Sequence, residues 1–322
     1  MMQQKIATIF GGTGFVGRYI VRELARAGYT VKVVTRVPER AYFLKPYGVV
    51  GQIVPVAASL KDPTTIDALV RGSDVVVNCI GVLFERRRKD FIHAHVNIPR
   101  NIAAACARHN VGRFVHISAL SCDKGISRYA KTKHEGEQEI IKACPYATIL
   151  RPSVIFGPED QFFNMFAMLM QFLPVLPLIG GGKTKFQPVY VSDVATAAIS
   201  AITLPDIGDQ SPKGKIYELG GPGIFSFRDI YLMLGKWTGR KRLLLPVPFA
   251  LASLKAFFMQ MIPPRPLLTP DQVKSLKTDN IVSETALKIE DLGLYPTGVE
   301  RIVPAYLERF RSGGRFSDIK TA

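Results

Sequence analysis

The chain has 322 residues, of which 47% are hydrophobic and 21% are charged. This composition is that of a globular protein with a sizeable core, and it excludes a disordered or low-complexity chain. The formal net charge of +16 favours acidic partners, such as phosphate groups, nucleic acid, anionic lipid or an acidic protein face.

The cysteines and histidines show no spacing typical of metal ligands, so we expect no metal site. With so few cysteines in a chain of this length, we expect buried, reduced thiols and a reducing compartment. The cysteines are Cys79, Cys106, Cys122 and Cys144.

Strand and helix patterns alternate over the first half of the chain. Apolar runs rich in β-branched residues predict strands over 5–10, 30–36, 49–59, 73–81, 113–118 and 146–153. Helical periodicity predicts helices over 18–28, 66–70, 97–110 and 129–142. Continuous apolar strands that alternate with helices indicate the α/β class, with a doubly wound parallel sheet covered on both faces.

After the sixth strand the pattern becomes irregular, and proline and glycine become frequent. We therefore predict a Rossmann domain over 1–155, to which a strand and helix at about 186–204 return. A smaller α/β lobe is expected over 156–185 and 205–310. A mobile tail is expected over 311–322.

Two apolar stretches of the smaller lobe, 162–180 and 247–263, need to be distinguished from membrane spans. The first contains Asn164, Gln171 and two later prolines, so it predicts a buried helix followed by a loop. The second is too short to span a membrane and contains Lys255. A core helix is the preferred interpretation of both, and a helix facing a membrane surface or a partner is the alternative for the second.

A glycine motif, "GGTGFVG", joins the first strand to the first helix. Glycines at this spacing let the backbone turn sharply and approach a pyrophosphate, which then lies at the N-terminus of the helix. Because the motif follows a strand and opens an alternating series, it predicts dinucleotide binding. The residues expected to line the cofactor here are Gly11, Thr13, Gly14, Phe15, Val16 and Gly17.

The end of the second strand indicates which dinucleotide is bound. Thr35 and Arg36 stand where NAD sites carry an acid for the ribose 2′-hydroxyl, and Arg40 follows shortly after. Without that carboxylate a 2′-phosphate is not repelled, and a guanidinium can pair with it. NADP(H) is therefore favoured over NAD(H). The alternative is that both arginines are solvated surface charges.

Tyr129 and Lys133 form a Y-x-x-x-K pair in the predicted helix over 129–142, so their side chains share one helix face. An ammonium beside a phenol is expected to lower the pKa of the phenol and make it a general acid/base. The lysine is also able to bind the nicotinamide ribose.

With "NCIG" at 78–81, "HVN" at 95–97 and "RPSVIFGPED" at 151–160, these motifs resemble the extended short-chain dehydrogenase/reductase superfamily. Their order and spacing match over roughly the first 200 residues. The resemblance implies a cofactor lined by Ile80, Gly81, Tyr129, Lys133, Pro152 and Ile155, with Asn97 in a supporting role.

The chain departs from that superfamily at two places. Members carry a Ser or Thr just after the fifth strand, but here Ser118 stands one residue early and Ser121 is the candidate replacement. Ser59 stands where members often have an adenine-contacting Asp. The resemblance thus implies retained cofactor binding with a reduced catalytic set, namely Tyr129, Lys133 and Ser121.

The C-terminal segments 268–283 and 292–310 are similar to one branch of the superfamily, the nucleotide-binding accessory subunit of respiratory complex I and its bacterial homologues. This resemblance implies tightly bound NADPH and little or no turnover. It also implies a place at the junction with the membrane arm, with complex I subunits and anionic lipid headgroups as partners.

Two other functions remain open from the sequence. One is a free-standing NAD(P)-dependent reductase, dehydrogenase or epimerase for a hydrophobic or sugar-like substrate. The other is nucleic-acid binding through the basic run at 86–89, which we interpret instead as a solvated loop. No transit segment precedes the first strand. We therefore expect a bacterial chain, peripheral on the cytoplasmic face of the inner membrane, or on the matrix side if organellar.

Overall fold

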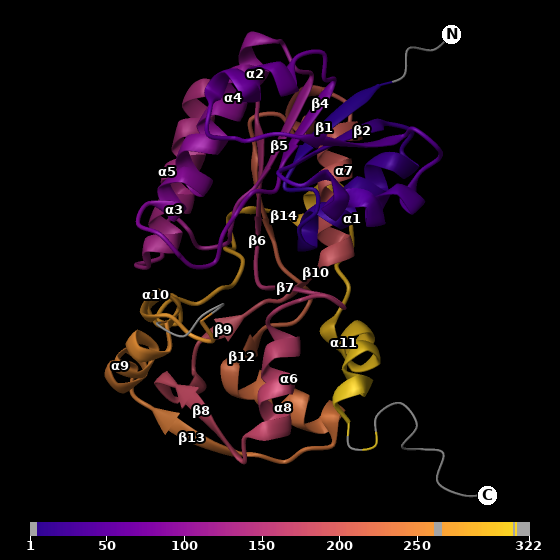
Figure 1. The fold of residues 1–322 in the computed structure, drawn as a ribbon. Helices are drawn as coiled ribbons and strands as arrows, with labels where there is room; N and C mark the ends of the chain where they lie inside the picture. Colours follow the sequence, from indigo (N-terminus) through magenta and orange to yellow (C-terminus); the bar gives the residue numbers. More distant parts are fainter. Residues whose placement is uncertain (1–4, 261–265, 312, 314–322) are drawn as a thin grey trace, which may run out of the picture.

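The computed structural model describes residues 5–260, 266–311 and 313 (Figure 1). Its larger unit is built on an eight-stranded sheet. The strands are β1 (Ile6–Phe10), β2 (Thr30–Thr35), β3 (Ile53–Ala57), β4 (Val75–Asn78), β5 (Arg113–Ile117), β6 (Thr148–Pro152), β11 (Ile216–Leu219) and β14 (Leu287–Lys288). Their order is β14-β11-β6-β5-β4-β1-β2-β3, and every neighbouring pair is parallel.

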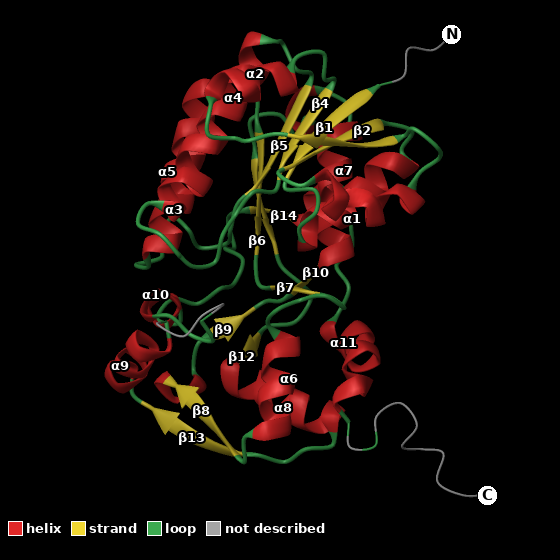
Figure 2. Ribbon diagram, viewed as in Figure 1, coloured by secondary structure: helices red, strands yellow, loops and turns green. Residues whose placement is uncertain are grey.

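Helices cover both faces of this sheet (Figure 2). On one face lie α1 (Phe15–Arg26) and α7 (Val191–Thr203), and on the other lie α2 (Pro63–Val70), α4 (Ile98–Arg108) and α5 (Arg128–Ala143). A 3-10 helix (Pro38–Tyr47) follows β2, while α3 (Asp90–Ile92) and a π-helical turn (His93–Asn97) lead into α4. The predicted doubly wound α/β fold is confirmed.

Alternate side chains of the central strands enter two separate hydrophobic cores. Ile9 and Val77 contact the side of α1 and α7, whereas Phe10 and Val76 contact the side of α2, α4 and α5. All four side chains are fully buried. Since both faces of each strand are covered, the strands read as continuous apolar runs rather than alternating ones.

The smaller lobe lies beyond the carboxyl edge of the sheet (Figure 1). Its helices are α6 (Phe163–Phe172), α8 (Phe227–Thr238), α9 (Phe249–Met259), α10 (Pro270–Ser275) and α11 (Val299–Leu307). Its strands are β7 (Ile155–Phe156), β8 (Val175–Ile179), β9 (Lys185–Phe186), β10 (Val189–Tyr190), β12 (Phe225–Ser226) and β13 (Leu243–Val247). Single 3-10 turns occupy Gly180–Gly182, Gly208–Gln210, Ile289–Leu292 and Glu308–Phe310.

Two parts of the chain differ from the sequence prediction. β11 and β14 fall within 205–310, which was assigned to the smaller lobe, yet they extend the main sheet beside β6. The segment after α6 was predicted as a loop, but 175–179 form β8, which pairs with β13 in a parallel ribbon. Both differences involve short strands whose pairing partners are distant in the sequence. The predicted tail at 311–322 lies almost wholly outside the described residues.

Helix α9 is not the core helix that its apolar sequence predicts. Only Ala252 and Ala256 of this helix are buried. Its large apolar side chains stand in solvent instead, with exposed fractions of 45% for Leu251, 57% for Leu254, 52% for Phe257 and 61% for Phe258. We refer to these four residues as the α9 face. Within the described residues, no helix combines the length and the apolar character needed to cross a bilayer.

Candidate functional site

The glycine motif forms a tight turn at the end of β1. Gly11 adopts φ +79°, and the amide of Gly14 donates a 3.0 Å hydrogen bond to the Gly11 carbonyl. A Cβ placed on Gly17 would lie 2.2 Å from that same carbonyl oxygen, so no side chain fits there. The start of α1 therefore closes against the turn, and its N-terminal amides stand next to an exposed Gly14. This cradle fits a pyrophosphate.

The turn lies where the strand order reverses. β1 pairs with β2 on one side and with β4 on the other, so the loops after β1 and β4 meet. A Cβ on Gly11 would lie 3.0 Å from the carbonyl carbon of Cys79 and 3.1 Å from the amide of Ile80. One residue on, a Cβ on Gly81 would lie 3.7 Å from Lys133 Nζ. The glycine turn, the "NCIG" segment and Lys133 thus line one crevice at a topological switch point.

Lys133 extends from α5 to the end of β5. Its ammonium donates a 2.9 Å hydrogen bond to the carbonyl of Ile117, and the residue is only 3% exposed. Burial lowers the pKa of Lys133 to about 8, and the nearby charge of Glu137 opposes that shift. Lys133 is therefore held in place at the sheet edge.

Tyr129 lies one turn before Lys133, among aromatic rings. Its ring packs edge-on against His95 at 5.3 Å and against Phe91 at 6.0 Å between centroids. Burial raises the pKa of Tyr129, followed by the charge of Cys122. The predicted lowering of the Tyr129 pKa by Lys133 is therefore wrong for the structure, because burial of the phenol raises this pKa and Lys133 is not among the groups that shift it.

His95 is a buried neutral residue next to this pair. The amide of Val82 donates to His95 Nε2 at 3.1 Å, so the ring proton is on Nδ1 and is donated to Thr132 Oγ1 at 3.0 Å. Burial, followed by the charge of Lys133, lowers the pKa of His95 to about 3. This hydrogen-bond chain fixes the loop after β4 against α5.

The hydroxyls of the two candidate serines each lie next to another group of the chain. Ser118 is buried, and its Oγ lies 3.9 Å from Cys122 Sγ. Ser121 adopts φ +58°, and its hydroxyl donates a 3.0 Å hydrogen bond to the carbonyl of Asp279 from the smaller lobe. In this conformation the Ser121 hydroxyl joins two segments of the chain.

The residues predicted for the adenosine end lie at the same sheet edge, after β2 and β3. Arg36 directly follows β2, Arg40 lies in the 3-10 helix behind it, and Ser59 follows β3. All three are exposed. Neither arginine forms an ion pair with another residue in the described part of the chain, so both guanidiniums are free for an external phosphate.

The other predicted cofactor residues occupy the ends of the elements around the crevice. Asn97 ends the π-helical turn, Pro152 ends β6 and Ile155 begins β7, where it pairs with Val189. Thr13 and Val16 flank the glycine turn and are partly buried. The ring of Phe15 lies 3.3 Å from the position of a Cβ on Gly157, so the loop after β7 covers the start of α1.

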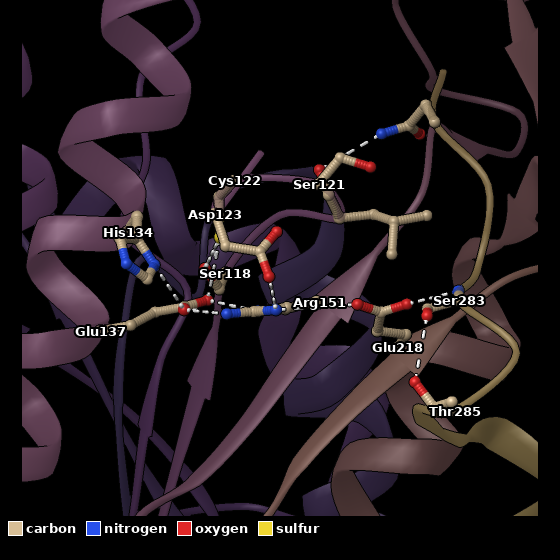
Figure 3. A network of polar contacts seen from close by, with 12 residues as sticks. Ser118, Ser121, Cys122, Asp123, His134, Glu137, Arg151, Glu218, Ser283 and Thr285 are labelled. Atoms are coloured by element: carbon tan, nitrogen blue, oxygen red, sulfur yellow. Dashed lines mark hydrogen bonds and ion pairs between the residues drawn. The ribbon is translucent and has the colours of Figure 1, made fainter. Parts of the chain in front are cut away.

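A buried ionic network, which sequence reasoning missed, lies behind the crevice (Figure 3). Arg151 on β6 donates from Nε and Nη2 to the two oxygens of Glu137 on α5, at 3.0 and 2.7 Å. It also donates to Asp123 at 3.0 Å and lies 3.6 Å from Glu218. Burial alone would lower the pKa of Arg151, but the hydrogen bond and charge of Glu137 raise it instead.

Three side chains of this region come close enough to suggest a metal site. Ligand atoms of Cys122, His134 and Glu137 lie within 4.8 Å of one another. Both oxygens of Glu137, however, already accept hydrogen bonds from the guanidinium of Arg151. Burial raises the pKa of the Cys122 thiol to about 12, with the charge of Glu137 as the next cause. A protonated thiol and an occupied carboxylate are poor metal ligands.

The segment Thr269–Ser283 of the smaller lobe contacts the start of α5 and the loops after β5 and β6, and we call it the strap. Its Asp271 accepts hydrogen bonds from the amides of Arg128 and Tyr129 at 2.7 and 2.9 Å. These contacts join residues that are 143 and 142 positions apart, so no local sequence pattern predicts them.

Comparison with known proteins shows the family to which this chain belongs. Residues 7–220 match the NAD dependent epimerase/dehydratase family. The chain belongs to this family. The fold is also that of a solved NADPH-dependent quinone oxidoreductase from Escherichia coli in complex with NADPH. The TM-score is 0.74 at 19% identity, over 94% of this chain and 99% of the other.

Relatives in sequence extend over nearly the whole chain, smaller lobe included. An Arabidopsis thaliana protein named "NADH dehydrogenase (ubiquinone) 1 alpha subcomplex subunit 9, mitochondrial" is 37% identical, over 96% of this chain and 79% of its own. The Mus musculus protein of the same name is 36% identical, over 95% of this chain and 81% of its own. These relatives cover the strap and α9, which lie beyond the family match.

Proposed function

We propose that this chain holds NADP(H) as an accessory subunit of respiratory complex I and catalyses little or no turnover. The observation that best supports this proposal is a contrast within one site. The glycine cradle and Lys133 are intact, whereas the hydroxyl of Ser121 is bonded to the Asp279 carbonyl.

Different residues of this chain bind different parts of the cofactor. The amides at the start of α1 bind the pyrophosphate, since unpaired N–H groups and the helix dipole favour an anion there. Arg36 and Arg40 pair with the 2′-phosphate of the adenosine ribose. Lys133 donates to the other ribose, next to the nicotinamide, whose ring supplies hydride when bound. Tyr129 carries its proton at neutral pH, as an ordinary phenol does, and burial raises its pKa further.

The relatives and the α9 face support a place for the chain in this assembly. Relatives at 36–37% identity are named as complex I subunits, so we propose complex I subunits near the membrane arm as partners. The α9 face and exposed Lys255 contact the anionic lipid headgroups beside them. The chain is then peripheral, on the cytoplasmic face of the inner membrane.

One measurement tests the holding role. The protein is purified without added nucleotide and denatured, and NADPH, NADP, NADH and NAD in the supernatant are quantified. We expect NADP(H) close to one per chain. An empty site that binds NADPH only loosely, together with rapid reduction of added quinone or ketone, would instead establish a free-standing reductase.

A second measurement tests the partnership. The tagged chain is recovered from membranes that have been solubilised with a mild detergent, and co-purifying proteins are identified by mass spectrometry. We expect subunits of complex I in the eluate. Recovery of the chain from such membranes without any of them would overturn the proposed assembly but leave the nucleotide result standing.

A further inference from the structure

We propose that NADP(H) occupancy and the placement of the α9 face are coupled through the strap. This inference rests on the proposed cofactor site and names a regulation of it. When the strap is in place, the crevice is closed and α9 is positioned. When the strap leaves, both are released together.

The first link joins the strap to the helix that carries Tyr129 and Lys133. Asp271 at the start of α10 accepts from the amides of Arg128 and Tyr129, the first two residues of α5. Ser127 satisfies the next amide, that of Ala130, from within the chain's own turn. Asp271 therefore supplies the remaining N-terminal acceptors of α5, and its negative charge is favourable at that end.

The second link joins the strap to the loops after β5 and β6. Asn280 Nδ2 donates to the carbonyl of Leu120 at 3.3 Å, and its Oδ1 accepts from the amide of Val154 at 3.1 Å. The Ser153 hydroxyl lies 2.6 Å from that same oxygen. Ser121 adds its bond to Asp279. The loops after β5 and β6 are thus both tied to one segment of the smaller lobe.

The third link joins the strap to α9. Val273 of α10 is fully buried against Ala252 and Ala256, the two buried residues of α9. Lys277 also stands over the ring of Phe249, 5.5 Å from its centroid. The residues of the α9 face are on the same helix but point to solvent, so the strap determines where that face is held.

These links make the strap a two-state element. Its apolar anchorage is small, and its other attachments are hydrogen bonds. Some of these reach Thr184, Lys185 and Gln187 of the smaller lobe, and the others reach loops that also border the cofactor. Cofactor binding orders those loops and so lowers the entropy cost of the strap's contacts. By linkage, binding of a lipid surface to the α9 face strengthens NADP(H) binding by the same factor.

Hydrogen exchange of the whole chain measures this coupling. NADPH is added at about 100 times its dissociation constant, which is determined beforehand by fluorescence titration. Amides that exchange only through openings that release the cofactor then slow by about 100-fold. We expect this slowing in 249–260 and 269–283 as well as in 11–17. Fast-exchanging amides of α11 serve as the control, and we expect no change in them.

Two variants separate coupling from general loss of stability. Asp271→Ala removes the acceptors of the α5 amides. We expect NADPH affinity to fall by about 10-fold, and the slowing in 249–260 to disappear. Asp229→Ala removes a comparable carboxylate, which accepts from the Ser226 amide at the start of α8, away from the strap. We expect its NADPH affinity to stay within about 2-fold of wild type.

Each outcome has one meaning. Slowing in 11–17 without slowing in 249–283 overturns the coupling and leaves the cofactor site intact. Slowing nowhere, with no measurable NADPH binding, overturns the proposed function itself. The exchange measurement on the wild-type chain decides the question even if Asp271→Ala does not fold.

Discussion

Lys133 Nζ donates a 2.9 Å hydrogen bond to the backbone carbonyl of Ile117, so the ammonium is buried against the end of β5. Burial lowers its pKa in the folded chain to about 8, from the ordinary value of 10.5. Below pH 8 both states carry the proton and the burial cost is present in full. Between pH 8 and 10.5 the native state binds fewer protons, so this cost is relieved as pH rises.

We therefore predict that the wild-type chain gains about 3 kcal/mol relative to Lys133→Met as the pH rises from 8 to 10.5. Urea denaturation of the two cofactor-free proteins across this range measures the difference. Lys131→Met, at an exposed position on the same helix, serves as the control and should follow the wild type. Parallel curves for wild type and Lys133→Met would show that the ammonium is not desolvated.

Acid sensitivity is predicted at His95. Burial lowers its pKa to about 3, below the ordinary value of 6.5, so the unfolded chain binds a proton that the native chain excludes. Stability from this residue is present above pH 6.5 and is lost as the pH falls through 3, by about 5 kcal/mol in total. His95→Gln keeps one acceptor and one donor without titrating, and we expect a shallower acid slope in its denaturation curves. His93→Gln, at an exposed position, is the control, and equal slopes in both variants would contradict this assignment.

The larger unit of the fold could be predicted because its information is local. Buried strand residues such as 75–77 form continuous apolar runs, and the glycine turn has a spacing that few other structures require. Strand β11 and the edge strand β14 could not be predicted, because four and two residues carry too little pattern to reveal their partners. The apolar composition of α9 indicates that its side chains will be covered. It does not indicate whether another part of this chain or a separate surface covers them.

The candidate site was predicted where it depends on one turn of chain, and missed where it depends on pairing across the molecule. The glycine residues and Lys133 follow from sequence spacing. The role of Ser121 depends on Asp279, 158 residues away, and the pairing of Arg151 with Glu137 joins a strand to a helix. Hydrogen bonds of this kind leave no periodic trace in the sequence.

The Arg151–Glu137 pair yields a stability prediction. Glu137 is fully buried, and Glu137→Gln would leave the guanidinium without its bidentate partner inside the core. We expect a loss of about 3 kcal/mol of unfolding free energy, since the buried guanidinium loses its bidentate carboxylate and keeps only Asp123 and Glu218 as partners. Glu135→Gln, at an exposed position on the same helix, should lie within about 0.5 kcal/mol of wild type. Denaturant titration distinguishes them, and a wild-type midpoint for Glu137→Gln would refute the argument.

Coenzyme preference is predicted to depend on Arg36. Arg36→Asp replaces an exposed guanidinium at the end of β2 with a carboxylate, which repels a 2′-phosphate and accepts from a 2′-hydroxyl. We expect NADPH affinity to fall by about 10- to 100-fold and NADH affinity to rise. Isothermal titration with both coenzymes gives the ratio, with Arg26→Asp on the far end of α1 as a charge-matched control. Unchanged NADPH affinity would show that Arg36 does not contact the phosphate.

Membrane attachment is predicted to depend on the α9 face. Replacing Leu254, Phe257 and Phe258 together with serine removes apolar area that is more than half exposed, so the fold should keep its melting temperature. Binding to vesicles of phosphatidylcholine and phosphatidylglycerol should fall by more than about 10-fold, because the apolar insertion that accompanies headgroup attraction is lost. Val50→Ser, at an exposed apolar residue of the larger unit, should bind like wild type. Vesicle flotation measures all three proteins, and undiminished flotation of the triple variant would assign membrane binding to another surface.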